Sequence, residues 1–215
     1  MANRPVFTAL DRRPFFAERD VEFQYFSGFS EAQKRRSIES LHAAYLRRFP
    51  GDAPLEVSTK SPEPLGAALS AFRLKLRLGS GAECPLECAF QGAKVFERGG
   101  PYADLLEKTP REAKRDDRLR ESGRLVGFRL EGTDFSAEPK TFFYDWLYAN
   151  AVRQAPALRE ALLAYRAFTD IEFNPKKSLN CQARAAAIYV SLAGCGLLED
   201  ALQSAEAFRR IVYGA

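Results

Sequence analysis

The chain has 215 residues, of which 46% are hydrophobic and 28% are charged. These proportions are typical of one globular domain and exclude a disordered or low-complexity protein. The chain carries 32 Lys and Arg residues against 28 Asp and Glu residues, which gives a net charge of +4. This mildly basic balance excludes a histone-like tail, although it is compatible with a ligand that carries phosphate.

Cysteine and histidine content limits the kinds of site that the chain can form. The single histidine, His42, excludes a His-rich metal site. In a chain of this length without a signal peptide the four cysteines are expected to be free thiols, and no metal and no cofactor is expected. No apolar run approaches the roughly 18 residues that span a bilayer. The first residues also lack the apolar core of a signal peptide. We therefore expect a cytoplasmic protein with no membrane partner.

The first half of the chain predicts two helices and two strands. Apolar residues at helical spacing after Ser30 predict a helix over 31–48. Residues 55–59 are a short strand candidate. Strict alternation of apolar and basic residues over 72–78 predicts a strand with a basic outer face. Pro85 can open a helix, which we expect over 85–97.

The second half of the chain is mainly helical by the same criteria. Thr109 and Glu112 form a capping-box pattern, and Asn180 can cap an Ala-rich helix. The predicted helices cover 109–121, 140–154, 156–167, 180–194 and 198–212, and the predicted strands cover 125–130 and 168–173. The expected fold class is α+β, a mostly helical single domain with a few short strands. The absence of βαβ alternation and of a glycine-rich phosphate loop argues against a Rossmann fold.

The most informative pattern is Glu87, Gln91 and Lys94, spaced i, i+4 and i+7 in an otherwise apolar stretch. On a helix these side chains share one face. A catalytic face of this kind would use Glu87 as acid or base, Gln91 to orient the substrate and Lys94 to stabilise or attack an electrophilic carbon. The alternative is a solvated helix face with a weak Glu–Lys interaction, worth about 0.2–0.5 kcal/mol.

A second polar cluster surrounds the turn at Asn174–Pro175. Asp170 precedes this turn, and Asn180 lies at the start of the following helix. Helix N-termini present free N–H groups that suit phosphate, so the segment is a candidate half of a binding site. The alternative is an ordinary strand-turn-helix with Asn180 as its cap.

Two further segments have a functional and a structural interpretation. The basic segment 111–129 is either a solvated surface or a contact for nucleic acid or diphosphate. The aromatic cluster 142–148 is either core or, through Trp146, a surface on which a base stacks.

Several of these motifs, in their order along the chain, resemble the NADAR domain. Glu87, Gln91 and Lys94 resemble its glutamate–glutamine–lysine helix, and Leu69-Ser70-Ala71-Phe72 resembles its Leu-Ser-Asn-Phe segment. Glu112–Arg115, Trp146 and then Asp170 with Asn180 follow in the family's order. The segments around 99–102, 142–148 and 168–178 are similar to the NADAR antitoxins associated with DarT-type toxins. Ala71 departs from the usual Asn, and the usual Trp-Gly after the C-terminal Asp is absent.

The resemblance covers residues 55–193 and implies a NADAR-like catalytic domain over 55–215. Residues 1–54 are then a branch-specific addition packed on the core. The implied activity removes ADP-ribose from guanine bases in DNA, with RNA left open, and reverses a DarT-type toxin. The implied catalytic residues are Glu87, Lys94 and Asp170, and the implied substrate-binding residues are Ser70, Gln91, Trp146 and Asn180.

Two other functions remain open from the sequence. One is an N-glycosidase that acts on a small nucleotide or a riboflavin-pathway intermediate. The other is a non-enzymatic module that binds ADP-ribose or the toxin itself. ADP-ribose is the expected product of the guanine-directed hydrolase and a ligand of the non-enzymatic module.

Overall fold

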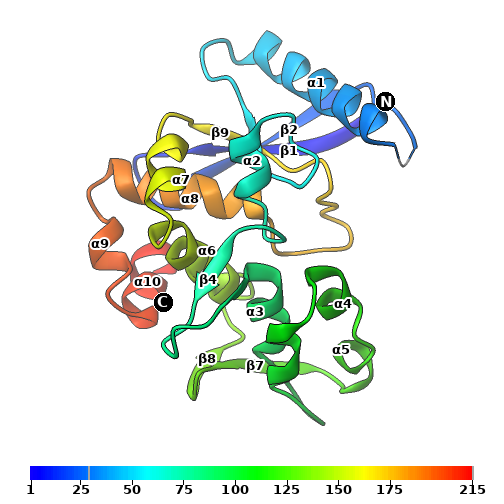
Figure 1. Ribbon diagram of the computed structural model, residues 1–215. Helices are drawn as coiled ribbons and strands as arrows, with labels where there is room; N and C mark the ends of the chain where they lie inside the picture. The colour runs from blue at the N-terminus through cyan, green and yellow to red at the C-terminus, as the bar shows by residue number, and fades with distance from the viewer. Residues whose placement is uncertain (29, 215) are drawn as a thin grey trace.

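A four-stranded sheet separates two helical layers in the computed structural model, which describes residues 1–28 and 30–214 (Figure 1). The strand order is β2-β1-β9-β3. Strands β1 (Ala2–Ala9) and β2 (Phe16–Phe23) form an antiparallel hairpin, and β9 (Ala167–Thr169) pairs with β1. Strand β3 (Leu55–Glu56) pairs with β9 in parallel. The sheet thus joins the first residues of the chain to its last third.

The hairpin of β1 and β2 was not predicted, because β1 is covered on both faces. Residues 5–9 are all buried, so the strand lacks the alternation that identifies a half-exposed strand. Val6 packs towards α1 (Glu31–Arg48), whereas Phe7 faces the main core with α8 (Gln182–Gly194). Pro5, which has no N–H to donate, lies outside the register of β1 with β9. Residues 1–54 therefore contribute two strands and one helix to the same packed unit.

Helix α1 confirms the first predicted helix at both ends. The Ser30 side chain accepts a hydrogen bond from the backbone N–H of Gln33, which caps the helix as the sequence predicted. Its buried face packs on the sheet through Ile38, Leu41 and Tyr45.

The structure shortens or divides several predicted elements. The helix expected over 85–97 ends early: α3 covers Leu86–Gly92, and Lys94 begins strand β6 (Lys94–Phe96). Val95 and Phe96 favour a strand, and Lys94 pairs with Phe128 of β7 (Leu125–Leu130). The helix expected over 109–121 is two helices, α4 (Pro110–Arg115) and α5 (Arg118–Glu121), interrupted at Asp116.

Two further predictions differ from the structure. Asn180 does not cap α8, whose N-cap is Cys181 without a side-chain hydrogen bond. The last predicted helix is divided into α9 (Leu198–Ala201) and α10 (Ala205–Tyr213), because the Ser204 hydroxyl accepts a hydrogen bond from Ala207 N–H and starts a new helix. The remaining elements are α2 (Pro64–Ala68), β4 (Lys75–Arg77), β5 (Glu83–Pro85), η1 (Ala103–Glu107), β8 (Thr133–Ser136), α6 (Phe142–Arg153) and α7 (Pro156–Leu162).

The centre of the core is formed by α6 against α8 (Figure 1). A buried ion pair joins the two helices: Arg184 Nη2 lies 2.9 Å from Asp145 Oδ2, and Tyr213 donates a hydrogen bond to the same oxygen from α10. Loss of one partner from such a pair typically costs about 3–5 kcal/mol.

Together these elements make the fold α+β and mostly helical, in one domain, as the sequence predicted.

Among the residues that the structure describes, no helix is both long enough and apolar enough to cross a membrane.

Candidate active site

A cleft of about 1060 Å³ lies between α3 on one side and the chain that leaves β9 on the other. Its volume is at the upper end of the roughly 300–1,000 Å³ typical of ligand sites. Six of the seven residues that the sequence singled out line it, namely Ser70, Glu87, Gln91, Lys94, Asp170 and Asn180. The tertiary structure thus brings together two polar clusters that lie far apart in the sequence.

The first wall, α3, carries a buried carboxylate and a buried amide in hydrogen-bond contact. Gln91 Nε2 donates to Glu87 Oε1 at 2.9 Å, and Lys114 Nζ lies 3.6 Å from the same oxygen. Gln91 Oε1 is buried, and it has no hydrogen-bond partner among the residues that the structure describes. Since an unsatisfied buried acceptor is costly, this oxygen is available to a ligand donor.

The N-terminus of α3 is fixed to the neighbouring chain by backbone hydrogen bonds. Glu87 N–H donates to Ala71 C=O at 2.9 Å, and Leu86 N–H donates to Leu74 C=O at 2.8 Å. Ser70 also lines the cleft, while its hydroxyl donates to Ala67 C=O at 2.7 Å. The position of the Glu87 carboxylate is therefore set by the main chain of residues 71–74.

Lys94 reaches the cleft from β6 rather than from the helix. Its Nζ lies 4.8 Å from the centre of the Phe90 ring. Burial lowers the pKa of Lys94 to about 8, an effect that Lys114 reinforces and the Glu87 carboxylate opposes. A substantial fraction of this amine is neutral near pH 8, which is the form that attacks carbon.

The second wall contains Asp170 at the end of β9. Asp170 Oδ1 accepts hydrogen bonds from the backbone N–H groups of Glu172 (3.0 Å) and Phe173 (3.1 Å). Burial raises the pKa of Asp170 well above its ordinary value, and the nearby Glu56 carboxylate raises it further. The environment therefore favours the protonated acid at this position.

Behind Asp170, a buried network of hydrogen-bonded side chains connects β9 to helix α1. Glu56 accepts hydrogen bonds from the Thr169 hydroxyl (2.6 Å) and from Ile171 N–H (2.8 Å). His42 Nε2 lies 2.8 Å from the Thr169 oxygen. Burial lowers the pKa of His42 to about 4, so its ring is neutral. Since the Thr169 hydroxyl donates its single hydrogen to Glu56, its oxygen accepts from the Nε2–H of His42.

Sequence reasoning missed Glu56 and the contact made by His42. An acidic residue between Leu55 and Val57 in an apolar strand was the available signal, because a buried carboxylate needs donors. The partners of Glu56 come from β9, more than a hundred residues later, so no local pattern indicates them.

The structure places Trp146 outside the cleft. Its ring packs against Phe135 with centroids 5.0 Å apart and against Phe143 at 6.2 Å.

Asn180 lies at the cleft, and its Oδ1 is buried without a hydrogen-bond partner in the described part of the chain. The aromatic rings that do line the cleft are Phe72, Phe90, Tyr144 and Phe173, none of which the sequence singled out for this purpose.

The rim of the cleft is basic. Three cations of α4 line it, Arg111, Lys114 and Arg115, as do three from other segments: Lys60, Arg120 and Lys177. Glu87, Asp170 and Glu172 are the acidic residues of the lining. The basic segment that the sequence left open as a diphosphate contact thus borders the cleft at α4 and α5. Within residues 1–28 and 30–214, no three His, Cys, Asp or Glu side chains lie close enough together to hold a metal ion.

Comparison with models of protein families identifies the family of the chain. The family model described as NADAR-DarT1, the DarT1-associated NADAR antitoxin, matches residues 2–215. No curated protein matches the chain. The match includes residues 2–54, which the sequence analysis had set apart as an addition to the general family.

Proposed function

Since the chain belongs to the family of DarT1-associated NADAR antitoxins, we propose that it hydrolyses the bond between ADP-ribose and guanine bases in DNA. It would thereby reverse the modification made by a DarT-type DNA ADP-ribosyltransferase. The observation that carries this proposal is the buried Glu87–Gln91 pair beside Lys94, opposite Asp170 in one cleft.

The size and charge of the cleft support a ligand of this class. Its volume of about 1060 Å³ accommodates a ligand with two nucleoside-sized parts. Arg111 and Arg115 provide positive charge for a diphosphate, and the aromatic rings Phe72 and Phe173 provide surfaces for stacking. The buried Glu87 carboxylate would then face the reacting sugar rather than the phosphates.

The proposed reaction begins with cleavage at C1″ of the ribose that is joined to guanine. Such a bond breaks through an oxocarbenium-like state, which the Glu87 carboxylate would stabilise. The neutral Lys94 amine then bonds to C1″ as the guanine nitrogen leaves, and the departing base takes a proton, for which protonated Asp170 is the proposed donor. The new Nζ–C1″ bond gives a glycosylamine, which becomes an imine when the nitrogen loses a proton, the C1″–O4″ bond of the ribose ring opens and O4″ takes up a proton. Water then adds to C1″ and the C1″–Nζ bond breaks, which releases ADP-ribose and restores the amine.

The direct test uses an oligonucleotide that is ADP-ribosylated on guanine. Incubation with the protein is expected to release free ADP-ribose and to restore the unmodified oligonucleotide, both measured by mass spectrometry. ADP-ribosylated RNA and an ADP-ribosylated guanine mononucleotide in parallel reactions separate a DNA-directed hydrolase from a small-molecule N-glycosidase. Binding of the modified oligonucleotide without any release would contradict the proposal and favour the non-enzymatic module.

A further inference from the structure

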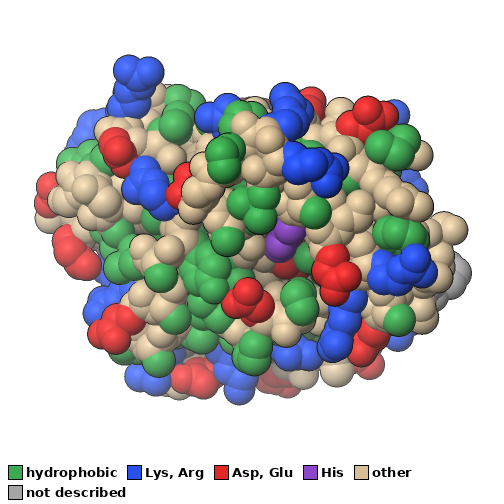
Figure 2. Space-filling view, turned by 90° about the horizontal axis from the view of Figure 1, so that it is seen from above, with side chains coloured by type: hydrophobic (Ala, Val, Ile, Leu, Met, Phe, Trp, Pro, Cys, Tyr) green, Lys and Arg blue, Asp and Glu red, His purple; other side chains and the backbone are tan. Residues whose placement is uncertain are grey.

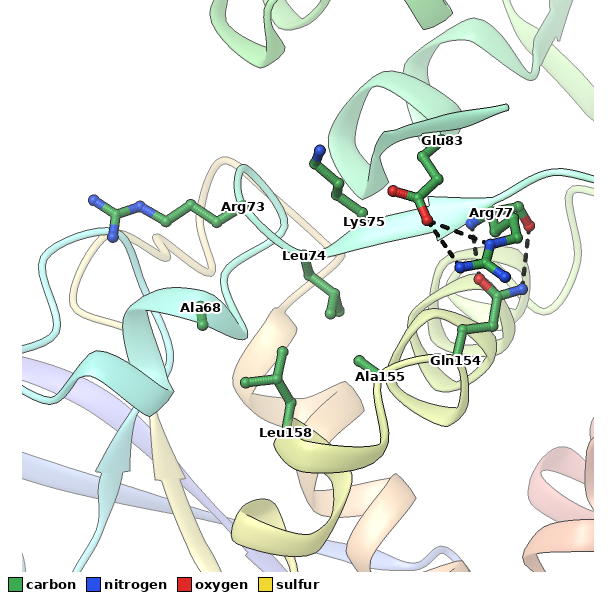
Figure 3. A pocket seen from close by; sticks show the side chains of 9 residues that line it. All are labelled: Ala68, Arg73, Leu74, Lys75, Arg77, Glu83, Gln154, Ala155 and Leu158. Atoms are coloured by element: carbon green, nitrogen blue, oxygen red, sulfur yellow. Dashed lines mark hydrogen bonds and ion pairs between the residues drawn. The ribbon is translucent and has the colours of Figure 1, made fainter. Parts of the chain in front are cut away.

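A second, smaller cavity is lined by residues that directly follow, along the chain, a segment of the active cleft (Figure 3). Its volume is about 340 Å³, and it lies between β4 and the start of α7. Leu74 and Leu158 point toward each other across its apolar floor, while the Arg73 and Lys75 side chains extend away from it. We call this cavity the β4 groove.

Three basic residues alternate along this segment with buried leucines. Arg73, Lys75 and Arg77 are exposed, whereas Leu74 and Leu76 are in the core. The strand expected over 72–78 is limited to β4, where Lys75 and Arg77 occupy alternate positions on the solvent side, and Arg73 lies in the turn before it. The sequence predicted this basic face, and the chemistry of the active cleft does not use it.

The three cations differ in what they already bind. Arg77 forms an ion pair with Glu83 at 3.2 Å (Figure 3). Within the residues that the structure describes, Arg73 and Lys75 form no ion pair and donate no side-chain hydrogen bond. Basic and acidic side chains are interspersed over the face in Figure 2, so positive charge alone does not mark a site. Two unneutralised cations beside an apolar floor make the β4 groove a candidate anion site.

The backbone that carries these cations is fixed. Arg77 N–H donates to Gln154 Oε1 at 2.8 Å, and Gln154 Nε2 donates back to Arg77 C=O at 3.1 Å (Figure 3). This double hydrogen bond ties β4 to the end of α6, so the charges are held in place rather than on a free loop.

The groove and the active cleft share one chain segment. Ala71 and Phe72 line the cleft, and Arg73 lines the groove. Lys75 follows Phe72 by three residues, which span at most roughly 10 Å. Successive nucleotides of one strand rise about 3.4 Å each, so phosphates a few nucleotides from a base in the cleft come within reach of the groove.

We propose that the β4 groove binds the phosphodiester backbone of the nucleic-acid strand that flanks the modified base. The identification of that strand as substrate rests on the proposed function. Arg73 and Lys75 supply the phosphate contacts, and the apolar floor faces the sugars. A free mononucleotide bound in the cleft would not extend to these contacts, so the groove selects for polymeric substrate.

The test is the binding of a short, unmodified single-stranded DNA oligonucleotide, followed by fluorescence anisotropy over a series of salt concentrations. The double variant Arg73→Gln, Lys75→Gln is expected to bind about tenfold more weakly at low salt. Its slope of log affinity against log salt should fall by about 1.4, because each phosphate contact on a single strand contributes about 0.7.

The matched control is the double variant Arg35→Gln, Arg47→Gln, which removes the same charge from exposed positions of α1. This control is expected to keep the slope of the wild-type chain. An unchanged slope in the groove variant, or equal losses in both double variants, would overturn the proposal.

A second readout separates this proposal from the proposed function. With ADP-ribosylated oligonucleotide, the groove variant should show a raised KM and an unchanged kcat, while release from the modified mononucleotide stays unchanged. If the wild-type chain releases no ADP-ribose but the anisotropy difference persists, the function fails and the groove stands. If the groove variant binds and turns over like the wild type, the proposal for the β4 groove is wrong and the proposed function is unaffected.

Discussion

The two walls of the active cleft are built in different ways. Glu87, Gln91 and Lys94 come from one short stretch of chain, and two of them contact each other directly at i, i+4. Asp170 instead depends on a buried network whose members, Glu56 and His42, lie far away in the sequence. In the proposed mechanism the first wall carries the groups that react with C1″, and the second supplies a carboxyl group whose protonation is set by its surroundings. Local spacing is enough to predict the Glu87–Gln91 pair, whereas the environment of Asp170 requires the whole sheet.

A large effect that tests this division is expected at Lys94. Lys94→Ala and Lys94→Arg should each lower the single-turnover rate by at least about 100-fold, since neither side chain supplies a neutral amine to C1″. Borohydride added during turnover should trap an adduct on wild-type Lys94, detectable by peptide mass spectrometry. Near-full activity of Lys94→Arg without a trapped adduct would leave Lys94 as an electrostatic contact only.

A smaller loss is expected at Asp170. Asp170→Asn removes the exchangeable acid but keeps a side chain of the same shape, so the single-turnover rate should fall about 30- to 100-fold. A modified guanine derivative that is a better leaving group should lose less, because it needs less protonation. An equal loss for both substrates would show that Asp170 does not donate the proton.

The pH dependence sharpens the contrast between the two walls. Burial lowers the pKa of Lys94 to about 8. The neutral amine therefore becomes scarcer as the pH falls below that value. The single-turnover rate should therefore rise about tenfold per unit from roughly pH 6 towards pH 8 and then level off. A rate that stays constant over this range would remove the neutral amine from the mechanism.

The smallest effect is expected at the far end of the buried network. His42→Ala removes the donor to the Thr169 hydroxyl, and loss of one buried hydrogen bond costs about 1–3 kcal/mol. The free energy of unfolding should fall by that amount, and kcat should fall only a few-fold because Glu56 keeps its other donors. His42→Gln, which can still donate, should recover most of the loss. Equal losses in both variants would show that packing, rather than the hydrogen bond, is what His42 supplies.

The stability of the wild-type chain carries a second signature of His42. Its folded pKa of about 4 lies below the ordinary value of 6.5, so the unfolded chain binds more protons between these two values. This contribution to stability is present above about pH 6.5 and is lost as pH falls towards 4. His42→Gln should lack this part of the pH dependence in thermal unfolding.

Sequence patterns located the first wall better than the second. The spacing of Glu87 and Gln91 predicted their shared face, because a helix fixes which residues are neighbours. The same argument extended the helix to Lys94, where pairing with Phe128 across the sheet ends it instead. The burial that lowers the pKa of Lys94 and the network behind Asp170 arise from tertiary packing, which no local spacing encodes.

The fold shows the same limit. Capping residues identified α1 and α4 at their N-termini because the Ser30 and Thr109 side chains bond within their own first turn. The β1–β2 hairpin was not predicted, because both faces of β1 are buried by helices from other parts of the chain. Trp146 illustrates the converse: its aromatic neighbours along α6 suggested a stacking surface, whereas contacts with Phe135 account for its position.

The claim that the α3 wall performs the chemistry is tested most directly by one comparison. Single-turnover release of ADP-ribose from a guanine-ADP-ribosylated oligonucleotide is measured for the wild type, for Glu87→Gln and for the exposed control Glu39→Gln. Gln at position 87 keeps an oxygen that accepts from Gln91, so the melting temperature should change little. We expect Glu87→Gln to be slower by about 10³-fold and Glu39→Gln to match the wild type. Equal rates in all three proteins would contradict the catalytic role of Glu87 and the account built on it.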